Sequence, residues 1–193
     1  MNIFYLHNEP MECARQHCDK HVVKMIVETA QLLSTAHRVL DGVQYEDRAK
    51  NNRRIHRWKL PDFRDSSMYK ASHIEHPSNQ WVRSSSANYY WLHGLLVGLI
   101  CEYEHRYKRT HKTEEVVELL NILPNNIKYS GFTEPTPAMP DQYKVEGDSI
   151  QSYRNYYIGE KHFATWTNRD TPEWYLKHDY ILQSEMEEYS INR

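Results

Sequence analysis

Apolar residues recur with helical spacing over residues 14–40, and this pattern constrains the fold more than any other feature of the sequence. The apolar positions are Ala14, Cys18, Val22, Met25, Ile26, Leu32, Leu33, Ala36 and Leu40. They share one wide face of the projected helix, and neighbouring positions extend that face around most of the circumference. A helix of this kind is expected to be largely buried by other elements of its own domain.

Local signals predict where this helix and two others begin and end. Helical periodicity is expected from about residue 11 to 40, and Gly42 follows as a helix terminator. A second long helix is predicted over about 78–109, with Ser78 as its cap. A third, short helix is predicted to open at Thr113 and to stop before Pro124.

The remaining segments are predicted to be one more helix, an arm and two long loops. Asp148, with Gln151 three residues later, is typical of a capped fourth helix. Residues 2–6 fit a short strand or an extended arm. Residues 43–77 and 124–147 contain several prolines and little periodicity, so both are expected to be irregular, the first with at most a short helical piece.

The sequence therefore predicts an all-α single domain over residues 1–176, built on two long helices with shorter helices and long loops. Residues 177–193 are expected to form a polar, acidic C-terminal tail. With 193 residues, 39% of them hydrophobic, the chain is long enough to bury a core. No apolar run approaches the roughly 18 residues that cross a bilayer, so no membrane partner is expected.

Cysteine usage and the first residues predict a cytoplasmic protein. Cys13, Cys18 and Cys101 are an odd number and include no CxxC pair, which argues against a disulfide framework. The chain start lacks the basic region and cleavage site of a signal peptide. The net charge is −2, yet residues 48–59 and 105–112 are basic and contain no acid. Each basic segment is either a surface for an anionic partner or an ordinary solvated face.

Four polar residues of the first helix recur at i, i+4, i+7 and i+11 and therefore stack along one line: His17, His21, Lys24 and Glu28. One interpretation is a solvent-exposed face with a Lys24–Glu28 ion pair. A second is a metal site, because two histidines at i, i+4 can bind one ion. A third is a metal-free acid/base site with Glu28 as its carboxylate, and this is the one we favour.

The second helix and the C-terminal segment each allow two interpretations. Glu102 and Arg106 either pair with each other, or Arg106 joins Ser84 and Asn88 in a pocket facing the first helix. The aromatic and basic side chains that alternate over residues 153–175 either bind nucleic acid or form core and rim. The sequence contains no P-loop, GxGxxG, GxSxG or HExxH motif, which argues against nucleotide-binding folds and classical zinc proteases.

The run Asp19-Lys20-His21-Val22-Val23, with Glu28 seven residues after the histidine, resembles the helix of the phage pyrimidine-dimer DNA glycosylases, also called endonuclease V. In that family an Asp-Gln-His-Leu-Met run precedes the catalytic glutamate by the same distance. The layout is also similar in its extended start, in a histidine before the second helix (His76), and in a late Trp174-Tyr175 pair. The chain otherwise has the general look of small phage proteins.

The resemblance implies an all-α fold that acts on a damaged or modified base in duplex DNA. Glu28 would take the role of the catalytic carboxylate, and His21 that of a DNA-contacting histidine. The family's nucleophile is the α-amine of a threonine exposed by removal of Met1. Here residue 2 is Asn2, and an asparagine at this position normally prevents removal of the initiator methionine. The amine of Met1 itself would therefore have to reach the site.

Two further positions depart from the family's pattern. An arginine beside the family's glutamate is Val27 here, and a second arginine three residues after the glutamate is Gln31. Both differences argue against recognition of pyrimidine dimers in particular. They leave excision of another lesion or of an unusual base as the expected activity.

We therefore expect a cofactor-free base-excision N-glycosylase, with or without an AP-lyase step, that binds double-stranded DNA in the host cytoplasm. Glu28 would stabilise the sugar cation or activate water, and Lys24 is a candidate imine-forming amine. The expected DNA contacts are Arg53, Arg54, Arg57, His76, Arg83, Asn88, Arg106, Arg154, Lys161, Trp166 and Arg169. The alternatives are a phage nucleotide or DNA-base modification enzyme and a non-catalytic phage protein that binds a host factor.

Overall fold

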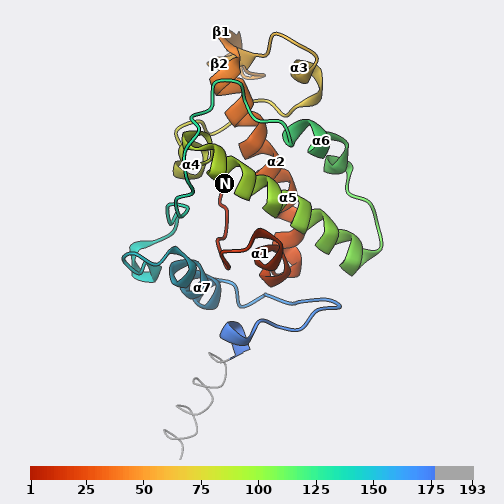
Figure 1. Cartoon of the computed structure of the whole chain (residues 1–193), viewed down its shortest axis with the longest axis vertical. Helices are drawn as coiled ribbons and strands as arrows, with labels where there is room; N and C mark the ends of the chain where they lie inside the picture. The colour runs from red at the N-terminus through yellow and green to blue at the C-terminus, as the bar shows by residue number, and fades with distance from the viewer. Residues whose placement is uncertain (177–193) are drawn as a thin grey trace, which may run out of the picture.

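The computed structural model describes residues 1–176 (Figure 1), so the predicted tail 177–193 lies outside the described residues. The described part is mainly α-helical, as the sequence predicts. Its helices are α1 (Pro10–Gln16), α2 (Asp19–Asp41), α3 (Arg64–Ser67), α4 (Pro77–Ser84), α5 (Ser86–Tyr107), α6 (Val117–Leu120) and α7 (Ser149–Glu160). Two 3₁₀ helices, η1 (Lys112–Val116) and η2 (Asp141–Tyr143), and two strands, β1 (Val43–Arg48) and β2 (Arg54–Lys59), complete the described elements.

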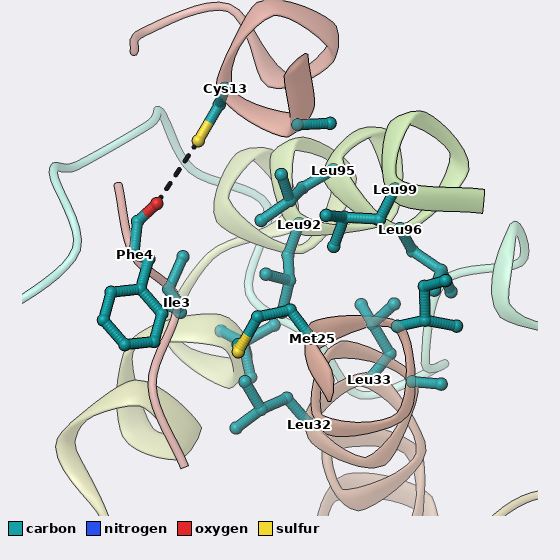
Figure 2. Packing of buried hydrophobic residues seen from close by; sticks show 14 of the residues in the cluster. Ile3, Phe4, Cys13, Met25, Leu32, Leu33, Leu92, Leu95, Leu96 and Leu99 are labelled. Atoms are coloured by element: carbon teal, nitrogen blue, oxygen red, sulfur yellow. Dashed lines mark hydrogen bonds between the residues drawn. The ribbon is translucent and has the colours of Figure 1, made fainter. Parts of the chain in front are cut away.

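The core forms where α2 and α5 pack against each other, with α1 lying over α5 (Figure 1). Figure 2 shows the leucines of α5 facing the apolar side of α2. Met25, Leu32 and Leu33 of α2 and Leu92 and Leu95 of α5 are fully buried. The apolar face predicted from helical spacing is therefore the face that α2 buries.

The first residues of the chain form an extended arm that runs through the protein interior. Residues 3–6 are almost completely buried. Cys13 of α1 fixes the arm, because its thiol donates to the carbonyl of Phe4 at 3.4 Å (Figure 2) and accepts the N–H of Leu6 at 3.3 Å. The arm thereby places Asn2 next to Glu28, near the middle of α2.

The prediction of one continuous helix over 11–40 is wrong, because the helix is interrupted between the end of α1 and the start of α2. Arg106 of α5 donates to the carbonyl of Arg15 and to that of His17, both at 2.9 Å. Carbonyls at a helix end need such partners, and here a distant guanidinium supplies them. The same guanidinium donates to the carboxylate of Asp19, the first residue of α2, at 3.0 Å.

The helix predicted over 78–109 is also interrupted, by the extended residue Ser85 between α4 and α5. The Ser85 hydroxyl accepts the N–H of Ala87 and so caps α5 at 3.1 Å. The cap of α4 is His76 rather than the predicted Ser78, since His76 Nδ1 accepts the N–H of Ser78 at 3.2 Å. Each predicted long helix is thus two helices.

Residues 43–77 are not irregular throughout, which corrects the prediction of a long loop. β1 and β2 form an antiparallel hairpin in which Val43 pairs with Lys59 and Arg48 with Arg54. Its turn includes Asn52, whose φ of 64° lies in the left-handed region that asparagine tolerates. The short helix α3 follows the hairpin and fits the predicted helical piece.

The elements after α5 agree with the sequence analysis. η1 and α6 occupy the predicted third helix, and residues 124–147 contain only η2 as a regular element. α7 begins as predicted, because the Asp148 carboxylate accepts the N–H of Gln151 at 2.8 Å. Within residues 1–176, every helix is too short or too polar to cross a membrane.

Candidate functional site

Glu28 lies on α2 beside the start of the chain, with its side chain only 17% exposed. Its Oε2 accepts the backbone N–H of Asn2 at 3.3 Å. Its Oε1 lies 3.4 Å from Nζ of Lys24, whose side chain is 60% exposed. The Lys24–Glu28 pair is therefore not simply a solvent-exposed ion pair. Lys24 is exposed to solvent, whereas the N-terminal arm covers Glu28.

Contacts from two other segments hold the chain start next to Glu28. Asn2 Nδ2 donates to the carbonyl of Ala138 at 2.9 Å. Asn79, fully buried near the start of α4, places its Nδ2 3.7 Å from Sδ of Met1. Met1 is half-buried as a result. The amine of Lys24 and the backbone N–H of Asn2, the residue next to Met1, thus lie at the two oxygens of one carboxylate.

The imidazole of His76 senses the charge at the start of the chain. Its pKa is lowered, first by burial and then by the positive charges of the N-terminus and His73, which the negative charge of Glu28 opposes. Because its Nδ1 accepts the N–H of Ser78, the neutral ring carries its proton on Nε2. His76 therefore joins Met1 and Glu28 in one electrostatic group.

His21 lies two turns before Glu28 on α2 and is 5% exposed. Burial lowers its pKa to about 3, with smaller contributions from the nearby charges of His17, Lys161 and Lys24. The hydroxyl of Tyr157 lies 2.5 Å from Nδ1 and also accepts the N–H of Cys18. In the tautomer in which the phenol donates to Nδ1, neutral His21 presents Nε2–H as a donor.

His17 is fully buried, and its Nδ1 donates to the carbonyl of Cys13 at 2.7 Å. Burial lowers its pKa to about 4. The ring centroids of His17 and His21 are 6.4 Å apart. Within residues 1–176, no cluster of three metal-ligating side chains forms around them or elsewhere. The metal interpretation of these two histidines therefore lacks a third ligand in the described chain.

Lys20 of α2, Lys161 and two aromatic rings of the C-terminal segment lie near His21. Lys20 Nζ lies 4.3 Å from the ring centroid of Phe163, which is 42% exposed and 6.2 Å from the His21 ring. Lys161 Nζ lies 4.3 Å from the ring centroid of Tyr156. Part of the predicted aromatic and basic segment therefore lies next to the surface of α2 around Lys20 and His21.

Three residues predicted to contact DNA are buried, which corrects their assignment. Asn88 is fully buried, and its amide binds the carbonyl of Trp81 and the side chain of Thr133. Arg106 is buried against Glu102 at 3.1 Å, so the predicted ion pair is confirmed and the pocket with Ser84 and Asn88 is wrong.

The third of these residues is Trp166, which is 8% exposed and donates to the carbonyl of Gln16 at 3.1 Å. Arg169 also has an internal role, because it binds both oxygens of Glu102, at 3.0 and 2.7 Å. Arg154 donates to the carbonyl of Leu6 at 2.9 Å and lies 5.5 Å from the ring centroid of Trp174. This part of the C-terminal segment therefore packs the arm and α1, as the core-and-rim interpretation predicts.

The remaining predicted cations lie on the hairpin and in the last turn of α4. Arg57 pairs with Asp47 at 2.7 Å, and Arg83 donates to the carbonyl of Ile74 at 2.6 Å. Arg53 and Arg54 are exposed, and their guanidinium groups have no hydrogen-bond or ion-pair partner within residues 1–176. The hairpin therefore offers at least these two cations to a ligand.

Tyr157 and Asn79 are site residues that the sequence analysis missed. Each meets its partner across a long stretch of sequence, so no local signal identifies either one. Comparison of the chain with protein-family models, curated proteins and solved structures finds no match.

Proposed function

We propose that this protein is a DNA base-excision N-glycosylase whose reaction centre is Glu28. The observation that carries the proposal is one sheltered carboxylate that contacts the Lys24 amine through one oxygen and the start of the chain, at the Asn2 N–H, through the other. A primary amine beside a carboxylate suits attack on a sugar carbon followed by imine formation. The resemblance of residues 19–28 to the pyrimidine-dimer glycosylases supports the same assignment.

The Glu28 carboxylate would stabilise the positive charge that develops on the deoxyribose as the glycosidic bond breaks. Such a charge is best stabilised by a fixed negative group that water does not screen. Glu28 is well placed for this, because the arm covers it and the Asn2 N–H orients one of its oxygens. Its other oxygen lies next to the Lys24 ammonium.

The nucleophile is the neutral amine of Met1 or of Lys24. Its nitrogen attacks C1′ while the C1′–N bond breaks, and the base leaves with the bonding electron pair and takes up a proton. Loss of the amine protons and opening of the sugar ring give an imine, which borohydride reduces to a stable amine. Of the two candidates, Met1 is the more sheltered.

The surface beside the centre would hold the DNA around the extruded nucleotide. Lys20 and Lys161 would contact phosphates, and the exposed ring of Phe163 would stack where the base has left the helix. Neutral His21 would donate a hydrogen bond rather than accept a proton at neutral pH.

A panel of damaged and hypermodified duplexes tests the proposal through base release and borohydride trapping. The native chain should release a base from at least one duplex, and Glu28→Gln should abolish release. Glu118→Gln, at an exposed position of α6, is the matched control. Absence of base release from every duplex would falsify the glycosylase assignment.

The trapped adduct identifies the nucleophile. Mass spectrometry of the N-terminal peptide first establishes that the amine of Met1 is free. Loss of the adduct in Lys24→Ala assigns Lys24, whereas loss after selective acetylation of the N-terminus assigns Met1. Base release without any adduct would replace the amine by water as the attacking group.

A further inference from the structure

A groove of about 670 Å³ separates β2 from the loop of residues 71–76. Its hairpin wall contains Arg53, Arg54, His56 and Trp58, and its loop wall ends at His76. Sites of about 300–1,000 Å³ typically hold one small ligand. The groove is therefore large enough for one or two nucleotides of a single strand and too small for a duplex.

The hairpin wall presents alternate residues of one strand. Arg54, His56 and Trp58 lie at i, i+2 and i+4 of β2 and so share one face. Trp58 is half-buried, as is Ile74 in the loop wall. The groove thus combines an aromatic and apolar interior with an exposed arginine at its edge.

Positive groups predominate around the groove. The guanidinium groups of Arg53 and Arg54 have no hydrogen-bond or ion-pair partner within the described residues, and both side chains line the groove. Glu75 is the one acidic residue in the described lining, and its carboxylate accepts the side-chain N–H of Gln80 at 3.1 Å. The charge favours an anionic ligand.

Buried side chains fix both walls. Arg38, 2% exposed, donates to the carbonyl of Trp58 at 3.0 Å and to that of Met68 at 2.9 Å. On the loop side, Asn79 Nδ2 donates to the carbonyls of Ser72 and His73, both at 2.9 Å. The walls are therefore held before a ligand arrives, which reduces the entropy lost on binding.

We propose that this groove binds a single, unpaired strand of DNA, with a base stacked on Trp58 and the adjoining phosphates at Arg53 and Arg54. Stacking on an aromatic ring beside cations is the usual way to bind unpaired strands, and it favours nucleic acid over an acidic peptide. The inference deepens the proposed function and rests on it for the choice of DNA. His76 lines the groove and also senses the charge of Glu28, so one residue links the groove to the Glu28 site.

Binding of fluorescent oligothymidylate to the full Glu28→Gln chain, measured by anisotropy at two salt concentrations, tests the groove without catalysis. Arg54→Ala should weaken binding about tenfold and reduce the salt slope by about one unit. Lys50→Ala, an exposed cation in the same hairpin but outside the groove, should change affinity less than twofold. Trp58→Ala should weaken binding about tenfold, and Trp58→Phe should restore most of it.

Three results would overturn the groove assignment. One is an Arg54→Ala chain that binds with native affinity, since that variant alters an exposed side chain and should fold. Another is a folded Trp58→Ala chain with native affinity. The third is displacement of the oligonucleotide by polyglutamate at equal charge concentration, which would assign the groove to an acidic peptide.

The test also separates the groove from the proposed function. Strand binding that depends on Arg54 and Trp58 supports the groove even where the native chain releases no base. Base release by the native chain, together with native strand affinity in Arg54→Ala and Trp58→Ala, supports the glycosylase and overturns the groove.

Discussion

Tyr157 of α7 places its hydroxyl 2.5 Å from Nδ1 of His21, which lies on α2, 136 residues earlier in the chain. The same hydroxyl accepts the N–H of Cys18, the residue before α2. One buried phenol thus joins the helix that carries Glu28 to the segment that carries Lys161. The geometry of the candidate site therefore depends on the packing of α7.

Replacing Tyr157 with Phe should destabilise the protein by about 1–3 kcal/mol. The ring would still pack, but His21 Nδ1 and the Cys18 N–H would lose their common partner in the interior. Urea unfolding at pH 7 measures the change in the free energy of unfolding. Tyr129→Phe, at a position that is 79% exposed, should stay within about 0.5 kcal/mol and serves as the control.

Acid should destabilise the fold between pH 6.5 and 4 because of three buried histidines. Burial lowers the pKa to about 4 for His17 and His37 and to about 3 for His21, from an ordinary 6.5. Protons therefore bind the unfolded chain more tightly. The full stability is present above pH 6.5 and is lost as the pH falls toward the folded-state values. At pH 5 each histidine should cost roughly 2 kcal/mol.

Urea unfolding at pH 7.5, 6 and 5 measures this loss. His37→Gln should flatten the dependence of the free energy of unfolding on pH, whatever its effect at pH 7.5. His162→Gln, at an exposed position, should leave the slope as it is. An equal free energy of unfolding at pH 7.5 and 5 would contradict the prediction. The carboxylates of Asp19 and Glu102 have lowered pKa values and act only at lower pH.

The Lys24–Glu28 ion pair should contribute little to stability. Lys24 is 60% exposed, so solvent screens the pair, and exposed i, i+4 pairs are worth about 0.5 kcal/mol or less. Lys24→Ala should therefore leave the thermal midpoint within about 2 °C. A much larger loss would mean that the pair is structural and would weaken its assignment to the reaction centre.

The elements that the sequence predicts well are those fixed by nearby residues. The Asp148 carboxylate caps α7 through an N–H only three residues away, and the apolar spacing of α2 directly gives its buried face. The contact between Lys24 and Glu28 is predictable for the same reason, since side chains at i and i+4 are neighbours on any helix. In each case the interacting residues are close in sequence.

Features that depend on distant residues were not predictable. The break before α2 exists because Arg106, far along the chain, binds the carbonyls at the end of α1. Asn88 is predicted to contact DNA because the helical pattern alone does not show that Thr133 covers its side chain. The hairpin was missed because most of its side chains are exposed, so its strands lack the alternation of a half-buried sheet.

Arg38 should be among the residues most important for stability. It is almost fully buried, pairs with Asp65 at 2.6 Å and donates to the carbonyls of Tyr69, Trp58 and Met68. Arg38→Met would leave these acceptors unpaired, and we expect a loss of about 3–5 kcal/mol in urea unfolding. Arg48→Met, at an exposed position, should cost less than about 1 kcal/mol. Similar losses for the two variants would contradict this role.

The close contact between α1 and α5 gives a final prediction, at Gly98. A Cβ there would lie 2.8 Å from Cβ of Ala14 and 3.2 Å from Sδ of Met11, so α1 would have to move. Alanine favours a helix over glycine by about 1 kcal/mol, but overpacking costs about 1–3 kcal/mol. Gly98→Ala should therefore give a net loss of about 1 kcal/mol in urea unfolding. Gly131→Ala meets no atom within 4 Å and should be neutral, so equal stability of the two variants would show that α1 is not seated against α5.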